Sequence, residues 1–307
     1  MQYILKSAFI ISISILSSFK EVVATSIKMF YTPDFDGALG KTDSYFSKYY
    51  KIRMSLRGNV LAYYRSLYNA NKITRIKEFK ARIPRIIHQI WIGSPLPQEY
   101  KAWQKTWKKW PGWEYKLWTD KDVEKFTFAN RDLYDAAKTY GQRADILRME
   151  ILNQFGGLYV DIDFECINPE IFTLLNNHYD FYVGLHSLDC PLVGPNNAII
   201  GAIAGHPILK AYVNGLRKRW KKPSSTIHGE VVLKTGPGFL GQLFLKHSNK
   251  GYKDIAFPPT FFYPLGCYQQ SRALSHLSED EIKQKVCRVE SAAIHWWETG
   301  WKKPVKK

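Results

Sequence analysis

The sequence predicts an α/β domain, and three observations favour this class. From Ile83 onward, short strand signals alternate with helical ones, which is the pattern of an α/β architecture. A helix expected from Gln142 to Phe155 ends in two glycines and runs directly into an apolar strand. The 307 residues, 45% of them hydrophobic, are enough to bury one full-sized core.

Each element follows from local signals along the chain. Pro84 and Gly93 bound a first expected strand, and Thr119 or Asp120 is a suitable N-cap for a short helix. In order, we expect a strand at 85–92, a helix at 97–110, a strand at 113–118, a short helix at 120–126, a helix at 142–155 and a strand at 158–164. On the 142–155 helix, the stripe expected to face the core is Ala144, Leu147, Ile151 and Phe155.

The N-terminal region differs in composition from the rest of the chain. Lys6 precedes an apolar run from Ala8 to Phe19, which predicts a signal peptide or a signal anchor within residues 1–25. We therefore expect a membrane-associated or secreted protein. The further division is a basic helical stem at 26–82, a catalytic domain at 83–304 and a basic tail at 305–307.

The stem carries most of the excess positive charge. Residues 41–85 hold twelve Lys or Arg against Asp43 and Glu78, and the whole chain has a net charge of +17, which favours anionic partners. Aromatic residues, among them Tyr63, Tyr64 and Tyr68, interleave with these charges. A helical unit packed on the domain edge and a helix lying on anionic lipid headgroups both fit this pattern. Nucleic acid is not expected, since no recognition motif accompanies the charge.

The four cysteines show no metal-binding spacing. Cys166, Cys190, Cys267 and Cys287 are widely separated, with no CxxC or Cys/His motif. They predict neither a zinc site nor a disulfide-rich scaffold, and leave room for one or two disulfides in an oxidising compartment.

Two aspartates mark the expected 158–164 strand as a ligand site. Alternation along a strand would put Tyr159, Asp161 and Asp163 on one face. Neighbouring carboxylates repel unless a cation or a shared proton relieves them. A divalent ion with oxygen ligands, Mn²⁺ or Mg²⁺, is the usual solution, and it would also hold the phosphates of a substrate.

The preceding helix adds a charged pair. Asp145 and Arg148 are three residues apart and share a helix face. One interpretation is a surface ion pair worth about 0 to 1 kcal/mol. The other is a polar clamp reaching the crevice of Asp161 and Asp163, because open α/β sheets bind ligands beyond the carboxyl ends of their strands.

Several ordered motifs together resemble a known family. The runs IPRIIHQIWIG at 83–93, WEYKLW at 113–118, RADILR at 143–148 and GGLYVDID at 156–163 are similar to the DXD-containing glycosyltransferases that include the yeast sphingolipid mannosyltransferases. More distantly, they resemble the clostridial glucosylating toxins. The resemblance implies a GT-A fold with a mixed central sheet, and transfer from a nucleotide sugar with retention of configuration.

The resemblance also implies roles for individual residues. Asp145, Arg148, Asp161 and Asp163 would form the catalytic set, Asp161 and Asp163 with His295 would hold the metal, and the donor would contact Trp91, Tyr159, Asp145, Arg148, Asp161, Asn197 and Trp301. Segments 195–200 and 235–238 would line the sugar and acceptor side. His295 could instead be an ordinary core histidine, and Glu298 departs from the small-residue pattern that the family has there.

The function expected from these observations is a retaining, metal-dependent hexosyltransferase. Its partners would be a nucleotide sugar, with GDP-mannose and UDP-hexoses as candidates, a glycan or glycolipid acceptor, and a membrane surface. A phosphohydrolase of the haloacid dehalogenase type is an alternative, although Glu165 stands where that motif has Thr or Val. A non-catalytic carbohydrate-binding protein of the same fold is another.

Overall fold

A computed structural model describes the fold of most of the chain. The described residues are 32–40, 44–74, 81–190, 192–222, 226, 229–267, 274–298 and 305, with the backbone alone described for 44–57. The predicted signal segment at 1–25 and Trp301 lie outside the described residues.

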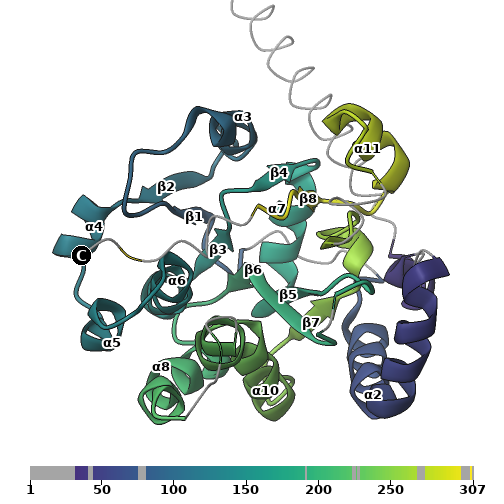
Figure 1. The fold of residues 1–307 in the computed structure, drawn as a ribbon, viewed down its shortest axis with the longest axis horizontal. Coiled ribbons are helices and arrows are strands. Elements are labelled where there is room, and N and C mark those ends of the chain that lie inside the picture. The colour runs from purple at the N-terminus through teal and green to yellow at the C-terminus, as the bar shows by residue number, and fades with distance from the viewer. Residues whose placement is uncertain are drawn as a thin grey trace, which may run out of the picture.

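A six-stranded sheet forms the centre of the molecule (Figure 1). Its order is β2-β1-β3-β6-β5-β7, with β1 Ile86–Ile90, β2 Glu114–Trp118, β3 Gly157–Val160, β5 Phe181–Leu185, β6 Pro195–Ala202 and β7 Asp254–Phe257. β1 pairs in parallel with β2 and β3, and β5 with β7, whereas β6 runs antiparallel to β3 and β5. The predicted α/β class with a mixed central sheet is confirmed.

Helices surround this sheet, and α6, α8 and α10 lie together on one side of it (Figure 1). The elements outside the central sheet are η1 Gly37–Leu39, α2 Ser44–Asn71, α3 Gln98–Thr106, α4 Asp120–Lys125, α5 Arg131–Asp135, α6 Tyr140–Phe155, β4 Phe164–Cys166, α7 Pro169–His178, α8 Pro207–Trp220, η2 Glu230–Thr235, α10 Pro237–His247, η3 Pro259–Phe261, α11 Glu279–Val286 and β8 Ala293–His295. The strands and helices predicted between 85 and 126 are confirmed with slightly shorter ends. Thr119 is the N-cap of α4 and forms a capping box with Asp122.

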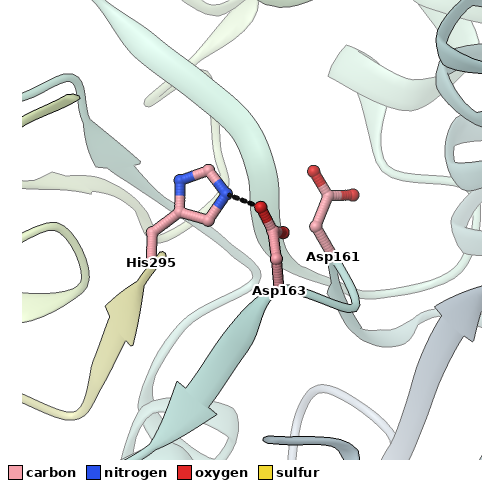
Figure 2. Close-up of side chains that lie close together, drawn as sticks. All are labelled: Asp161, Asp163 and His295. Atoms are coloured by element: carbon pink, nitrogen blue, oxygen red, sulfur yellow. Dashed lines mark ion pairs between the residues drawn. The ribbon is translucent and has the colours of Figure 1, made fainter. Parts of the chain in front are cut away.

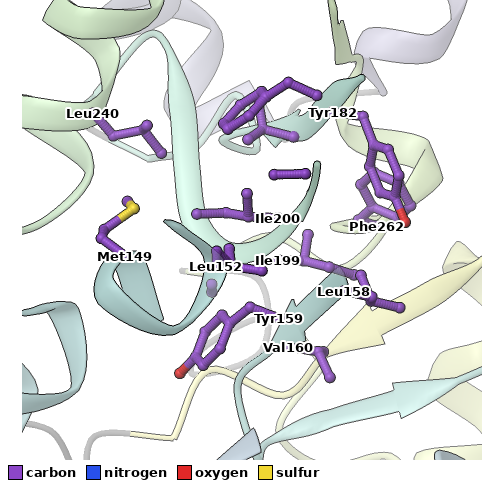
Figure 3. Close-up of a cluster of buried hydrophobic side chains, with 14 of the residues drawn as sticks. Met149, Leu152, Leu158, Tyr159, Val160, Tyr182, Ile199, Ile200, Leu240 and Phe262 are labelled. Atoms are coloured by element: carbon purple, nitrogen blue, oxygen red, sulfur yellow. The ribbon is translucent and has the colours of Figure 1, made fainter. Parts of the chain in front are cut away.

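The main core anchors β3 on both faces (Figure 3). Its residues come from strands, helices and a loop, and include Met149, Leu152, Leu158, Val160, Ile199, Ile200, Leu240 and Phe262. Burying a side chain of this size contributes about 1.5 to 3 kcal/mol relative to leaving it exposed. This packing therefore fixes the position of the end of β3, from which the residues after it extend.

The helix α6 is buried on more than one face. Leu147 and Ile151 are fully buried, as the predicted stripe requires, but Ala144 is only half-buried and Phe155 is 43% exposed. The expectation for Phe155 was wrong because this residue ends the helix at the surface, next to Trp118 and Phe126. The opposite face is buried against α8 and η2, so α6 lies inside the molecule.

The predicted single strand at 158–164 was wrong. β3 ends at Val160, residues 161–163 form a turn, and the chain resumes as β4 in a separate two-stranded sheet with β8. The backbone changes partner at this point: the N–H of Asp161 still donates to Ala198 O at 2.8 Å, and Phe164 already pairs with His295. The two aspartates thus sit on a turn between two sheets, not on one strand face.

Most of the described part of the basic stem is the helix α2, which packs beside β7. Tyr64 and Tyr68 are 1% and 0% exposed and belong to the main core. Of the two interpretations of the stem, contact of these two tyrosines with lipid is therefore excluded, and a helix packed on the domain edge describes this part of the chain. In the described residues, we find no helix with both the length and the apolar character needed to cross a bilayer.

A buried histidine fixes the turn that leads into β3. The Trp118 indole N–H donates to His88 Nδ1 at 3.2 Å, so His88 Nε2 carries the ring proton and donates to Gly156 O at 2.9 Å. Burial lowers the pKa of His88 to about 4, which keeps the ring neutral at pH 7. The adjacent Gly157 has φ +105°, and a Cβ there would lie 2.6 Å from the carbonyl oxygen of Ile86.

We predict that Gly157→Ala destabilises the fold by about 2 kcal/mol or more, because the new methyl group meets backbone in a conformation that disfavours side chains. Gly58→Ala is the matched control, since nothing lies within 4 Å of a Cβ on that exposed helical residue. It should change stability by less than about 1 kcal/mol, in the stabilising direction. Urea unfolding of both variants measures the difference, and equal midpoints would contradict the prediction.

Candidate metal and donor site

Three side chains from distant parts of the sequence converge at the end of β3 (Figure 2). Asp161 and Asp163 come from the turn after β3, and His295 comes from the end of β8. One possible ligand atom from each lies within 4.8 Å of the others, and His295 Nε2 is 3.0 Å from Asp163 Oδ2. The change of sheet after Val160 creates this cluster, because β4 and β8 pair Phe164 with His295.

The chemistry of this cluster suits a divalent ion. Two carboxylates and one imidazole are donors that Mn²⁺ accepts, whereas Mg²⁺ prefers oxygen alone. Burial raises the pKa of Asp161, Arg148 opposes the shift, and the like charge of Asp163 adds to it. Nδ1 of His295 is buried without a hydrogen-bond partner among the described residues. A cation here would relieve the repulsion between the two carboxylates.

The segment at 295–298 folds over Asp163. The backbone N–H groups of Trp296 and Glu298 donate to Asp163 O and Asp163 Oδ2, each at 2.9 Å. Trp297 adopts φ +58° between them, a left-handed conformation that costs roughly 1 to 2 kcal/mol. The His295 ring stacks on Phe164 at 4.4 Å and contacts Trp297 at 4.3 Å. These contacts fix both the aspartate and the imidazole.

Arg148 connects the cluster to Asp145. Its Nη2 atom lies 3.3 Å from Asp145 Oδ1 and 3.3 Å from Asp161 Oδ1, and its Nη1 donates to Asn197 O at 2.7 Å. The guanidinium also lies over the Tyr159 ring, 4.7 Å from its centroid. The interpretation of Asp145 and Arg148 as a surface pair was wrong, because the side chain of each is only 6% exposed.

Asp145 is held on both oxygens. Asn197 Nδ2 donates to Oδ1 at 2.7 Å, and Thr235 Oγ1 donates to Oδ2 at 2.8 Å. Burial nevertheless raises the pKa of Asp145 to about 6, with Arg148, Thr235 and Asn197 acting in the opposite direction. Desolvation therefore outweighs the ion pair and the two hydrogen bonds at this carboxylate.

The remaining predicted donor-binding residues have different surroundings. Tyr159 is buried, and its hydroxyl donates to Asp161 Oδ1. Trp91 follows β1, half-buried, with its ring 5.0 Å from Tyr100. Burial raises the pKa of Tyr100 to about 12, and the charges of Glu298 and Asp163 add to this shift. Trp301 lies outside the described residues.

Two site residues were not singled out from the sequence. Thr235 was named only within segment 235–238, which the resemblance places on the sugar and acceptor side, and its hydroxyl donates to Asp145. Tyr263 is fully buried, has its ring 5.7 Å from His295, and has no hydrogen-bond partner for its hydroxyl among the described residues. The Thr-Gly-Pro-Gly sequence was a usable signal for Thr235, whereas Tyr263 sits in an aromatic run that any core could contain.

Comparison with known proteins gives matches over the central part of the chain. The inositol phosphoceramide mannosyltransferase 3 of Schizosaccharomyces pombe is 34% identical over 168 residues, 52% of this chain and 44% of that protein. The inositol phosphoceramide mannosyltransferase 1 of the same yeast is 26% identical over 207 residues, 65% of this chain and 62% of that protein. The chain thus spans about half the length of the curated relatives it matches.

A similar solved structure is the PaToxG glycosyltransferase. It is 20% identical, with a TM-score of 0.44, over 64% of this chain and 80% of that one. Residues 97–182 match the family described as "Glycosyltransferase sugar-binding region containing DXD motif". This interval contains Asp145, Arg148, Asp161 and Asp163. Residues 97–182 of this chain are therefore similar to the DXD-containing sugar-binding region of glycosyltransferases.

Proposed function

We propose that this chain is a divalent-metal-dependent hexosyltransferase of the GT-A type, which moves a hexose from a nucleotide sugar to a hydroxyl group with retention of configuration. The observation that carries the proposal is the continuous polar chain from His295 through Asp163 and Asp161 to Arg148 and Asp145. It joins a site that suits a metal to a buried carboxylate able to accept hydrogen bonds from a sugar.

In this proposal, different residues bind different parts of the nucleotide-sugar donor. Asp161, Asp163 and His295 would hold Mn²⁺, or Mg²⁺ less well, and the bound ion would stabilise the charge that develops on the departing nucleoside diphosphate. Arg148 and Asp145 would position the hexose, with Asn197 on the same side, and Trp91 would contact the base. Residues 295–298 would exclude water from the departing group, which strengthens every charge interaction there.

The geometry favours attack on the same face of the sugar as departure. A double displacement needs a carboxylate free to bond to carbon. Both oxygens of Asp145 accept hydrogen bonds, Asp161 accepts one from Tyr159, and Asp163 contacts His295 and the Glu298 N–H. With all three carboxylates occupied in this way, an oxygen of the leaving diphosphate would take the proton of the acceptor hydroxyl.

The donor and acceptor are proposed from the relatives. Two of them are named inositol phosphoceramide mannosyltransferases, which supports GDP-mannose as donor and a glycolipid hydroxyl as acceptor. The predicted signal segment at 1–25 and the net charge of +17 fit a membrane-associated or exported enzyme working beside anionic lipid.

A donor screen tests the proposal directly. Purified protein with Mn²⁺ is offered GDP-mannose, UDP-glucose, UDP-galactose and UDP-N-acetylglucosamine, and release of nucleoside diphosphate is measured with and without a glycolipid acceptor. Hydrolysis or transfer from one donor supports the enzyme. Binding of a donor without turnover would favour the non-catalytic alternative, and release of phosphate from simple phosphomonoesters would favour the phosphohydrolase.

The metal site generates one prediction. His295→Ala should weaken Mn²⁺ binding by roughly 10- to 100-fold, because one metal ligand and its contact with Asp163 are lost. Excess EDTA should abolish turnover. His276→Ala is the control, since that histidine is exposed and is not part of the cluster. Calorimetric titration of Mn²⁺ reads the affinity without relying on activity. Unchanged Mn²⁺ binding in His295→Ala would show that His295 contributes packing alone and does not bind the metal.

A second prediction concerns Asp145, which would contact the hexose of the donor. Asp145→Asn keeps the shape of the side chain but removes its charge beside Arg148, so transfer should fall by about 100-fold or more. Affinity for the nucleoside diphosphate should stay within a few-fold, because the lost contact is to the sugar. Asp132→Asn, which breaks an exposed pair with Arg217, is the matched control. Equal losses in transfer and in nucleotide affinity would make Asp145 a structural residue.

A further inference from the structure

Two cysteines outside the polar cluster lie close to one another. Cys190 is in the connection between β5 and β6, Cys267 follows η3, and their sulfur atoms are 3.2 Å apart across 77 residues of sequence. A disulfide requires about 2.05 Å between sulfurs, so a movement of roughly 1 Å separates this pair from a covalent bond. Cys166 is engaged elsewhere, with its sulfur 3.8 Å from Ala292 O.

The two segments are already aligned by other contacts. Asp189, next to Cys190, is buried, and its Oδ1 accepts hydrogen bonds from the Ser187 hydroxyl at 2.7 Å and from the Cys267 N–H at 3.2 Å. Gly266 permits this approach, because a Cβ there would lie 2.2 Å from Asp189 Oδ2. The sulfur atoms therefore meet through an ordered contact between the two segments.

We infer that Cys190 and Cys267 form a disulfide in the oxidised protein, and that this bond braces the segment packed against His295 and Trp297. This segment carries Tyr263 and Leu265. Leu265 O accepts the Trp297 indole N–H at 2.9 Å, and the Tyr263 ring lies 5.7 Å from that of His295. A bond at Cys267 thus holds the support of both Trp297 and His295.

The reaction is a thiol–disulfide exchange with a small-molecule disulfide such as oxidised glutathione. One protein sulfur, deprotonated, attacks the glutathione disulfide and releases one glutathione thiolate; the second protein sulfur then attacks the mixed disulfide and releases the other. Two protein thiols are oxidised and one glutathione disulfide is reduced to two thiols. The hydrogen bond with the Cys190 sulfur and, next, burial raise the pKa of Cys267.

Peptide mapping of the full chain tests the bond. No Lys or Arg occurs from 149 to 209, so trypsin leaves Cys166 and Cys190 on one peptide. The Cys166→Ser/Cys287→Ser variant removes this ambiguity and keeps the pair. After incubation with oxidised glutathione, it should lose both thiols and give a cross-linked peptide joining 149–210 to 254–272, sensitive to reductant. Retention of both thiols, or glutathione adducts without the cross-link, would overturn the inference.

A stability measurement tests the bracing role. Closing a loop of this length restricts the unfolded chain, so the oxidised Cys166→Ser/Cys287→Ser protein should melt roughly 5 °C or more above its reduced form. The Cys190→Ser/Cys267→Ser variant should show no difference between the two conditions. Equal melting temperatures for the oxidised and reduced pair would remove the bracing role. Neither measurement depends on glycosyl transfer. Both therefore test the disulfide even if the proposed enzyme function is wrong.

Discussion

The Arg148 guanidinium, buried between Asp145 and Asp161, is the interaction on which the site depends. It contacts both carboxylates at 3.3 Å and donates to the backbone of β6. Breaking such an arrangement at one partner leaves a buried charge uncompensated, which costs about 3 to 5 kcal/mol. A single side chain therefore connects the helix α6, the turn after β3 and the strand β6. It helps to fix the positions of Asp145 and Asp161, whereas Asp163 is held by the backbone of Trp296 and Glu298.

Much of this arrangement could be predicted from sequence, and the errors have physical causes. The strand β1, the helix α4 and the glycine-ended helix α6 carry local signals, namely apolar runs, caps and breakers, and each was placed within a few residues. Apart from Asp161 and Asp163, the stretch from Leu158 to Phe164 consists of aliphatic and aromatic residues that favour a strand. What divides it is the pairing of Phe164 with His295, a contact between distant residues that no local pattern encodes.

The same distinction applies to the site residues. The spacing of Asp161 and Asp163 and of Asp145 and Arg148 indicated a ligand site, because charges that close together need compensation. Burial was not readable from spacing, so the sequence left open both a surface ion pair and a clamp in the crevice for Asp145 and Arg148, and the structure excludes the surface pair. Tyr64 and Tyr68 left a similar choice open: aromatic residues among lysines and arginines suit a lipid surface and suit a core, and only the packing of α2 beside β7 decides. Tyr263 gave no signal at all.

The pairing of β4 with β8 has a consequence for biosynthesis. Asp163 and His295 are about 130 residues apart in the sequence, so the two aspartates leave the ribosome long before the imidazole that meets them. A nascent chain that has produced the whole central sheet still lacks one wall of the cluster. Under the proposed function, a chain terminated before His295 would retain Asp161 and Asp163 but lack the imidazole of the proposed metal site.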